Sequence, residues 1–290
     1  MSEPAGRMLD VGDTRLYAEV RGEAHLPPLI VLHGGPGLDH HEFADDLDPL
    51  TDTVRLVLLD LRAQGLSARD AAPETWTLPQ MAADVSAVAA ALGAQRYAVL
   101  GHSFGAFVAL QHAVAFPGAS SATVVSCGVP AARWLEDVPA RLETFEPLHL
   151  REQVRRSWAD EAGVQTEAAF AQLMHDQMPW HFADPQDPRI PAYEERTSGT
   201  RYSPEVLRVM AESGYGGLDV EDRLSAVRSP TLVLAGRHDR TCVPEAAEAT
   251  AAGIPGAQLH IFEQSGHMPF VEQPQDYLNV VRDFLKTQLG

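Results

Sequence analysis

Short apolar runs alternate along this chain with longer stretches of helical periodicity, and this alternation constrains the fold more than any other feature. An apolar run of about four to eight residues is typical of a buried strand, and a helical stretch between two such runs is typical of a parallel crossover. The pattern predicts an α/β protein with a mostly parallel central sheet flanked by helices. The expected strands of this parallel part are Pro28–His33, Val54–Asp60, Tyr97–Gly101, Ala122–Cys127, Pro230–Ala235 and Gln258–Phe262.

An antiparallel hairpin is expected to open the sheet, with strands at Met8–Val11 and Arg15–Val20 and the turn at Gly12-Asp13. Three helices are expected to pack on the sheet. Thr77-Leu-Pro-Gln80 has the form of a capping box, and the helix that it begins is expected to end at Leu92, before a glycine. The other two are expected at Phe104–Phe116 and Pro274–Gln288.

Residues 129–222 interrupt the alternation, because they are rich in Trp, His, Arg, Glu and Pro and show no strand pattern. We expect a helical cap of residues 129–222, inserted after the sixth strand, on a core of residues 1–128 and 223–290. Such a cap would lie over the carboxyl edge of the sheet, where ligands bind in open α/β folds. The expected cap helices are Leu135–Leu142, Leu148–Asp160, Glu167–Gln177 and Pro204–Ser213.

The composition excludes some classes of partner. The formal net charge is −18, so nucleic acids and anionic membranes are poor partners. No apolar stretch approaches the length of about 18 residues that a membrane span needs, and no signal peptide is visible at the amino end. Cys127 and Cys242 are expected to be two reduced thiols. A cytoplasmic protein is expected.

Gly101-His102-Ser103-Phe104-Gly105 matches G-x-S-x-G between an expected strand and an expected helix. This is the context in which the motif presents a nucleophilic serine on a sharp turn. The amino end of the following helix favours the negative charge that develops when the serine attacks a carbonyl. The sequence therefore predicts Ser103 as a nucleophile, with a packing role for His102.

A glycine-rich loop, His33-Gly34-Gly35-Pro36-Gly37, follows the first expected parallel strand. With Gly101–Gly105 it resembles the proline iminopeptidase family of α/β hydrolases, and Asp60–Ser67 resembles that family's D-x-R-G-x-G-x-S with Ala63 in place of a glycine. The resemblance covers residues 15–127 and 217–285 and matches the cap poorly. It implies the α/β-hydrolase fold and an oxyanion hole made by the N–H groups of Gly35 and Phe104.

The order Ser, acid, His along the chain is expected for this fold. Asp239 and His267 each follow an expected strand, which would place both in loops at the carboxyl edge beside Ser103. We expect His267 to act as the base and Asp239 to orient it. His238 is expected to be structural, and Asp219 and Asp222 lie at the wrong end of their strand.

No cofactor or metal is expected. The glycines at 34, 35 and 37 do not form a dinucleotide fingerprint, and no P-loop is present. Among the 12 histidines no pair has a metal-binding spacing on one helix, and neighbouring His40 and His41 are expected to face apart.

The substrate is the open question. Resemblance implies that acids hold the substrate's free amine, but Arg240 follows the catalytic Asp and Arg208 takes a second acid position. Two cations would favour an anionic substrate end, unless both arginines pair with nearby glutamates. Glu212 is a candidate amine binder, and Trp180 and Tyr215 are candidates for an apolar pocket or for cap core.

Three functions stay open. The first is a serine hydrolase, similar to a proline iminopeptidase, that acts through an acyl-enzyme on a small amide, short peptide or ester. The second is a carboxylesterase or lactonase with an anionic or apolar substrate end. The remote third is a non-catalytic ligand-binding homologue.

Overall fold

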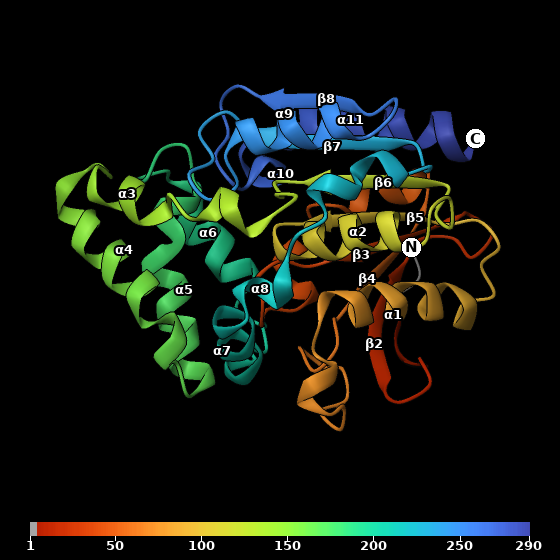
Figure 1. Ribbon diagram of the computed structural model, residues 1–290, viewed down its shortest axis with the longest axis horizontal. Helices are drawn as coiled ribbons and strands as arrows, with labels where there is room; N and C mark the ends of the chain where they lie inside the picture. The colour runs from red at the N-terminus through yellow and green to blue at the C-terminus, as the bar shows by residue number, and fades with distance from the viewer. Residues whose placement is uncertain (1–4) are drawn as a thin grey trace.

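The computed structural model describes residues 5–290, and its centre is an eight-stranded sheet of order β1-β2-β4-β3-β5-β6-β7-β8 (Figure 1). The first two strands, β1 and β2, form a hairpin, and β2 also pairs antiparallel with β4, whereas all other pairs are parallel. The expected mostly parallel sheet is therefore confirmed. The strands are β1 (Ala5–Asp10), β2 (Arg15–Arg21), β3 (Pro28–Leu32), β4 (Arg55–Leu59), β5 (Ala98–His102), β6 (Ala122–Ser126), β7 (Thr231–Gly236) and β8 (Gln258–Phe262).

Helices cover both faces of the sheet because successive residues of a buried strand point to opposite sides. On β7, Val233 and Ala235 pack with α9 (Pro244–Gly253), whereas Leu232 and Leu234 belong to the core under α11 (Pro274–Leu289). Two further helices, α1 (Leu78–Ala91) and α2 (Phe104–Ala115), pack with each other on the α9 face. The Thr77 hydroxyl accepts from the Gln80 N–H and begins α1 as the sequence indicates.

A helical cap is inserted between β6 and β7, and Figure 1 shows its helices gathered beyond one end of the strands. The exact boundaries of 129 and 222 stay a prediction. The cap helices are α3 (Val138–Glu143), α4 (Leu148–Asp160), α5 (Glu167–His181), α6 (Arg189–Arg196), α7 (Pro204–Glu212) and α8 (Gly214–Gly217). The remaining short elements are η1 (His40–Phe43), η2 (Asp48–Asp52), η3 (Pro73–Thr75), η4 (Ala132–Leu135), η5 (Glu161–Gly163), η6 (Glu221–Ala226) and α10 (Pro269–Glu272).

Among the described helices of eight or more residues, three differ clearly from the sequence pattern, each in connection with a proline. The helix α5 continues to His181 although Pro179 lies inside it. Both α6 and α9 were not expected, and each has a proline in its first turn, at Pro191 and Pro244. Proline is tolerated there because the first N–H groups of a helix have no intrahelical partner, so proline alone is a poor signal of a helix end.

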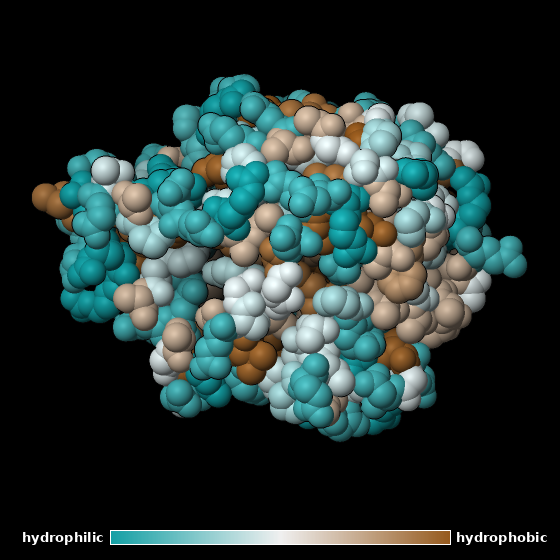
Figure 2. Space-filling view, in the orientation of Figure 1, coloured by the Kyte–Doolittle hydropathy of each residue, from teal (hydrophilic) through white to brown (hydrophobic). Residues whose placement is uncertain are grey.

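The surface is mostly polar over the cap, with hydrophobic residues near the centre of the view where the cap meets the core (Figure 2). No helix of the described residues is both long enough and apolar enough to cross a membrane.

Candidate active site

Ser103 occupies a strained turn between β5 and α2, with φ 53° and ψ −119°. Close packing holds this turn. A Cβ added to Gly101 would lie 2.1 Å from the carbonyl oxygen of Gly105, and one added to Gly105 would lie 2.2 Å from that of Leu32. Only glycine fits at these two positions, so the sequence on both sides of Ser103 is dictated by the turn that presents the serine.

His267 and Asp239 are joined at the ends of β8 and β7. The His267 Nδ1–H donates to Asp239 Oδ2 at 2.7 Å, while Asp239 Oδ1 accepts from the backbone N–H groups of Thr241 and Cys242, both at 2.9 Å. Burial lowers the pKa of His267, but the charge and hydrogen bond of Asp239 more than offset this and raise it above its ordinary value. Because Nδ1 carries the proton in neutral His267, Nε2 has a free lone pair.

Two other histidines flank the His267 ring. The ring centroids of His102 and His181 lie 5.0 and 5.1 Å from that of His267. Burial, followed by the charge of His267, lowers the pKa of both residues well below the ordinary value, so both are neutral. The backbone N–H of His267 donates to the His181 carbonyl at 2.6 Å, and this bond joins the loop that carries His267 to the end of α5.

Ser103 and His267 line the same cavity, which is partly open to solvent. Gly35 and Pro36 contribute from the glycine-rich loop, and the cap contributes most of the remaining wall. The wall is largely aromatic and aliphatic. Its acidic residues are Glu42 and Glu161, and no arginine or lysine of residues 5–290 lines it. Such a space, mostly apolar with a few polar groups, is typical of a small-molecule site.

The glycine-rich loop is held by hydrogen bonds from its neighbours. The N–H of Gly34 donates to Glu42 Oε2 and that of Gly37 to Gln64 Oε1, both at 2.6 Å. Phe104 is the first residue of α2, where N–H groups have no intrahelical partner. This arrangement is compatible with the oxyanion donors that the resemblance implies, at Gly35 and Phe104, and their role stays a prediction.

Comparison with known proteins agrees with this fold. The family model described as alpha/beta hydrolase fold matches residues 27–274. The chain belongs to the α/β-hydrolase family. The proline iminopeptidases of Heyndrickxia coagulans and Clostridium botulinum are each 28% identical to it, over 90% and 93% of this chain and 91% and 94% of the relative. The crystal structure of a proline iminopeptidase from Mycobacterium smegmatis superposes with a TM-score of 0.75 at 26% identity, covering 98% of both chains.

The two arginines singled out in the sequence do not line the cavity of this α/β hydrolase. The Arg240 guanidinium donates to the carbonyls of Phe182 at 2.6 Å and Ala183 at 3.0 Å, and lies over the Phe145 ring. Arg208 donates to the Val164 carbonyl. Both cations therefore bind cap backbone, which removes the reason that the sequence offered for an anionic substrate end.

The other three candidate substrate residues have different environments. Trp180 is fully buried in the cap, and its Nε1–H donates to Thr241 Oγ1 at 2.8 Å. Glu212 is exposed at the end of α7. Of the three, only Tyr215 lines the cavity, in the left-handed region at φ 55° and edge-on to Phe107.

Sequence reasoning missed both acids of the cavity. Glu42 lies on η1, a few residues beyond the glycine-rich loop, and burial raises its pKa to about 7, although the hydrogen bond from Gly34 opposes this. The only available signal was its proximity to that loop in the sequence. Glu161 lies in the poorly matched cap, and its sequence position carried no signal.

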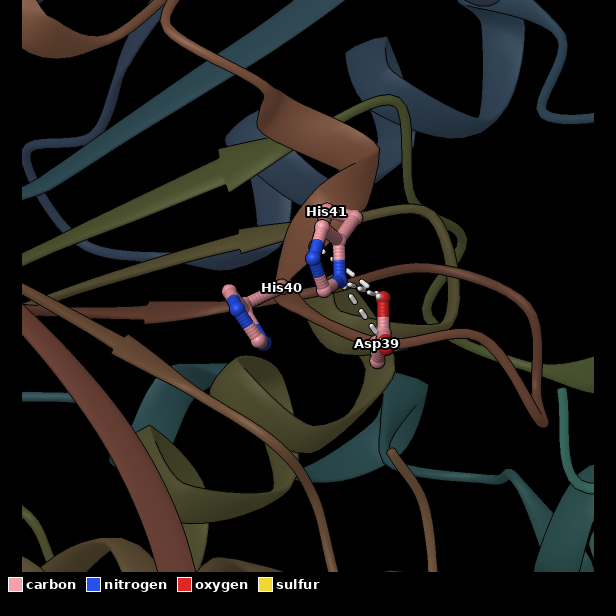
Figure 3. A group of neighbouring side chains, drawn as sticks. All are labelled: Asp39, His40 and His41. Atoms are coloured by element: carbon pink, nitrogen blue, oxygen red, sulfur yellow. Dashed lines mark hydrogen bonds and ion pairs between the residues drawn. The ribbon is translucent and has the colours of Figure 1, made fainter. Parts of the chain in front are cut away.

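A cluster of Asp39, His40 and His41 on and beside η1 corrects another expectation (Figure 3). The two imidazoles do not face apart, because their centroids are 4.2 Å from each other. The Asp39 carboxylate is hydrogen-bonded to His41 Nδ1 at 3.0 Å, and the Asp60 carboxylate is hydrogen-bonded to His40 Nδ1 at 2.7 Å. Burial lowers the pKa of His40, but its hydrogen bonds to Asp60 and Glu19 raise it to about 10. We interpret the cluster as a network of ion pairs that fixes η1, because His40 lies between Asp60 and Glu19 and His41 pairs with Asp39.

Proposed function

We propose that this α/β hydrolase is a serine hydrolase that acts through an acyl-enzyme on a small amide or ester, in the manner of a proline iminopeptidase. The observation that carries the proposal is the His267–Asp239 hydrogen bond, which leaves His267 Nε2 free in the cavity that Ser103 also lines. A serine on a nucleophile turn beside a base that is itself oriented by an acid is the arrangement that acyl transfer requires.

The reaction would proceed in two halves. His267 Nε2 takes the proton of Ser103 Oγ as that oxygen attacks the substrate carbonyl, and the N–H groups of Gly35 and Phe104 stabilise the resulting oxyanion. His267 then gives the proton to the leaving amine or alcohol, and the acyl-enzyme remains. A water molecule, deprotonated by His267, attacks the ester in the same way and releases the acid and Ser103. Asp239 stabilises the imidazolium in both halves.

Glu42 favours a substrate with a free amine. Its carboxylate lines the cavity beside the glycine-rich loop and accepts from Gly34, within one loop of the proposed oxyanion hole. An ammonium group would offset the cost of burying this carboxylate, whereas an anionic substrate would add to it. The similarity to proteins named proline iminopeptidases points in the same direction.

The apolar wall favours a second candidate, a carboxylesterase. Arg240 stands where the family's acid is implied, and it faces cap backbone instead of the cavity. A substrate without an amine would find aromatic and aliphatic contacts there. Hydrolysis of proline β-naphthylamide and of p-nitrophenyl butyrate, compared by kcat/KM, distinguishes the two. Preference for the amide supports the peptidase, and activity on the ester alone supports the esterase.

The nucleophile is tested by replacing Ser103 with alanine. We expect Ser103→Ala to lose turnover by a factor of about 10⁴ or more and to lose labelling by a fluorophosphonate probe, with the circular dichroism spectrum unchanged. Ser198→Ala, at an exposed serine of the cap, is the control and should retain both. Labelling of the Ser103→Ala protein at the wild-type rate would refute the assignment.

A further inference from the structure

The cavity has a far end, built by one face each of α4–η5 and α5. Trp158 and Glu161 lie three residues apart at the end of α4, and Gln177 and His181 lie four residues apart on α5, so each pair shares a helix face. All four residues line the cavity. The His181 ring lies 5.1 Å from the His267 ring, and the Trp158 ring lies 6.4 Å from that of His181.

Glu161 lies about one helical turn after Trp158, and Gln177 lies about one turn before His181. The Gln177 Nε2–H donates to Glu161 Oε1 at 2.9 Å, so the two residues lie on one level. Gln177 lies one helical turn, about 5.4 Å of rise, toward the amino end of α5, whereas the loop of His267 binds at the carboxyl end of that helix, at His181. Glu161 is thus a carboxylate of the same cavity as Ser103, and it is bound to a residue one helical turn away from His181, which contacts the loop of His267.

The Glu161 carboxylate has no cationic partner in residues 5–290, since it belongs to none of the salt bridges there and no arginine or lysine lines the cavity. Burial raises its pKa to about 7, although the hydrogen bond from Gln177 opposes this. A carboxylate turned toward an apolar cavity with only an amide donor is costly, and a cation from outside would offset that cost.

Two aromatic residues share the cavity with this carboxylate. Trp158 and Tyr215 both line the cavity. Burial first, and then the charge of Glu161, raises the pKa of the Tyr215 phenol, so the phenol and the carboxylate lie within electrostatic reach. Within residues 5–290, the buried Trp158 Nε1–H has no hydrogen-bond partner. Aromatic faces combined with a carboxylate are the usual recognition elements for alkylammonium groups.

We propose that Glu161, with Gln177 and the rings of Trp158 and Tyr215, forms a subsite for a cationic group at the end of the substrate that is remote from the scissile bond. The proposal rests on the proposed function, because the remote end is defined relative to the carbonyl that Ser103 attacks. It differs from the amine contact suggested for Glu42, which lies beside the glycine-rich loop. The substrate class is therefore a small ester or amide whose acyl part ends in an ammonium group.

The test uses two esters that differ only in charge. One is the p-nitrophenyl ester of hexanoic acid with a terminal trimethylammonio group, and the other is its neutral isostere, in which carbon replaces that nitrogen. Wild-type protein should prefer the cationic ester in kcat/KM. Glu161→Gln should lower this preference about ten- to hundredfold, the range for losing a hydrogen-bonded or ion-paired charge.

Glu152→Gln removes an exposed acid from α4 and is the matched control, which should leave the preference unchanged. A wild-type protein that favours the neutral ester, or a Glu161→Gln variant with the wild-type preference, would overturn the proposal. Calorimetric binding of hexyltrimethylammonium to both proteins gives a reading that does not need Ser103. If neither ester is hydrolysed but binding weakens in Glu161→Gln, the proposed function fails and the subsite stands. Equal affinities reject the subsite.

Discussion

Cys127 occupies a second position from which an acidic side chain could bind His267. It follows β6, and its sulfur lies within 4.8 Å of ligand atoms of both Asp239 and His267. Burial raises the pKa of this thiol well above its ordinary value, so it is a small neutral group beside the ion pair. A carboxylate at residue 127 would reach the same imidazole from the neighbouring strand.

Exchange of the acid between the two strands follows from this geometry. Asp239→Asn should reduce kcat by about 10⁴, because the imidazole loses the partner that fixes its tautomer. The double variant Asp239→Asn/Cys127→Asp should have a kcat at least about tenfold higher than that of Asp239→Asn alone. Cys127→Ser in the same background supplies no charge and should restore nothing. The measurement is kcat on the better substrate, and a folded double variant as slow as Asp239→Asn would contradict the prediction.

The pH dependence of activity follows from the raised pKa of His267. The base must be neutral, so activity is present above its pKa and falls as pH drops through it. Because Asp239 raises that pKa above its ordinary value, we expect the acidic limb of kcat/KM to have its midpoint above pH 6.5. Glu42 titrates in the same range, and a Glu42→Gln variant should keep the limb. A midpoint at or below pH 6.5 in both proteins would contradict the assignment of the base.

At the scale of elements, the end of α5 is bound to two loops, the one that carries Asp239 and the one that carries His267. Arg240, next to the catalytic acid, donates to the carbonyls of Phe182 and Ala183. The Glu272 carboxylate accepts from the N–H groups of Ala183 and Gly266, so it links the cap to the loop of His267. These contacts hold the last turn of α5 although Pro179 removes a hydrogen bond from it.

Loss of the arginine should therefore affect both stability and turnover. Arg240→Leu leaves cap carbonyls without their donor, and we expect the free energy of unfolding to fall by about 1.5–3 kcal/mol in urea titration, with a lower kcat. Arg237→Leu removes an exposed arginine paired with Glu263 and should change stability much less, because solvent screens exposed ion pairs. Equal stability of the two variants would argue against a stabilising role for the hydrogen bonds from Arg240 to the cap carbonyls.

At the scale of the whole molecule, local patterns were sufficient for the core and insufficient for the cap. Buried strands such as β3 and β7, and the glycines around Ser103, reflect packing constraints that leave few residue choices, so the sequence predicts both. The joining of His267 to Asp239 could be expected because parallel strands end at one edge. Glu161 and the backbone role of Arg240 depend on how cap helices pack, and their local sequence carries no trace of that packing.

The anchored end of α5 also limits how ligands enter. A cap that moved as one rigid body would have to break the hydrogen bonds that join residues 181–183 to Arg240, Glu272 and His267 at each opening. Such a movement would also displace His267. Opening of the cavity is instead expected to leave the end of α5 in place. The side chains that this end of α5 presents to the cavity, such as His181, would then keep their positions whether or not a substrate is bound.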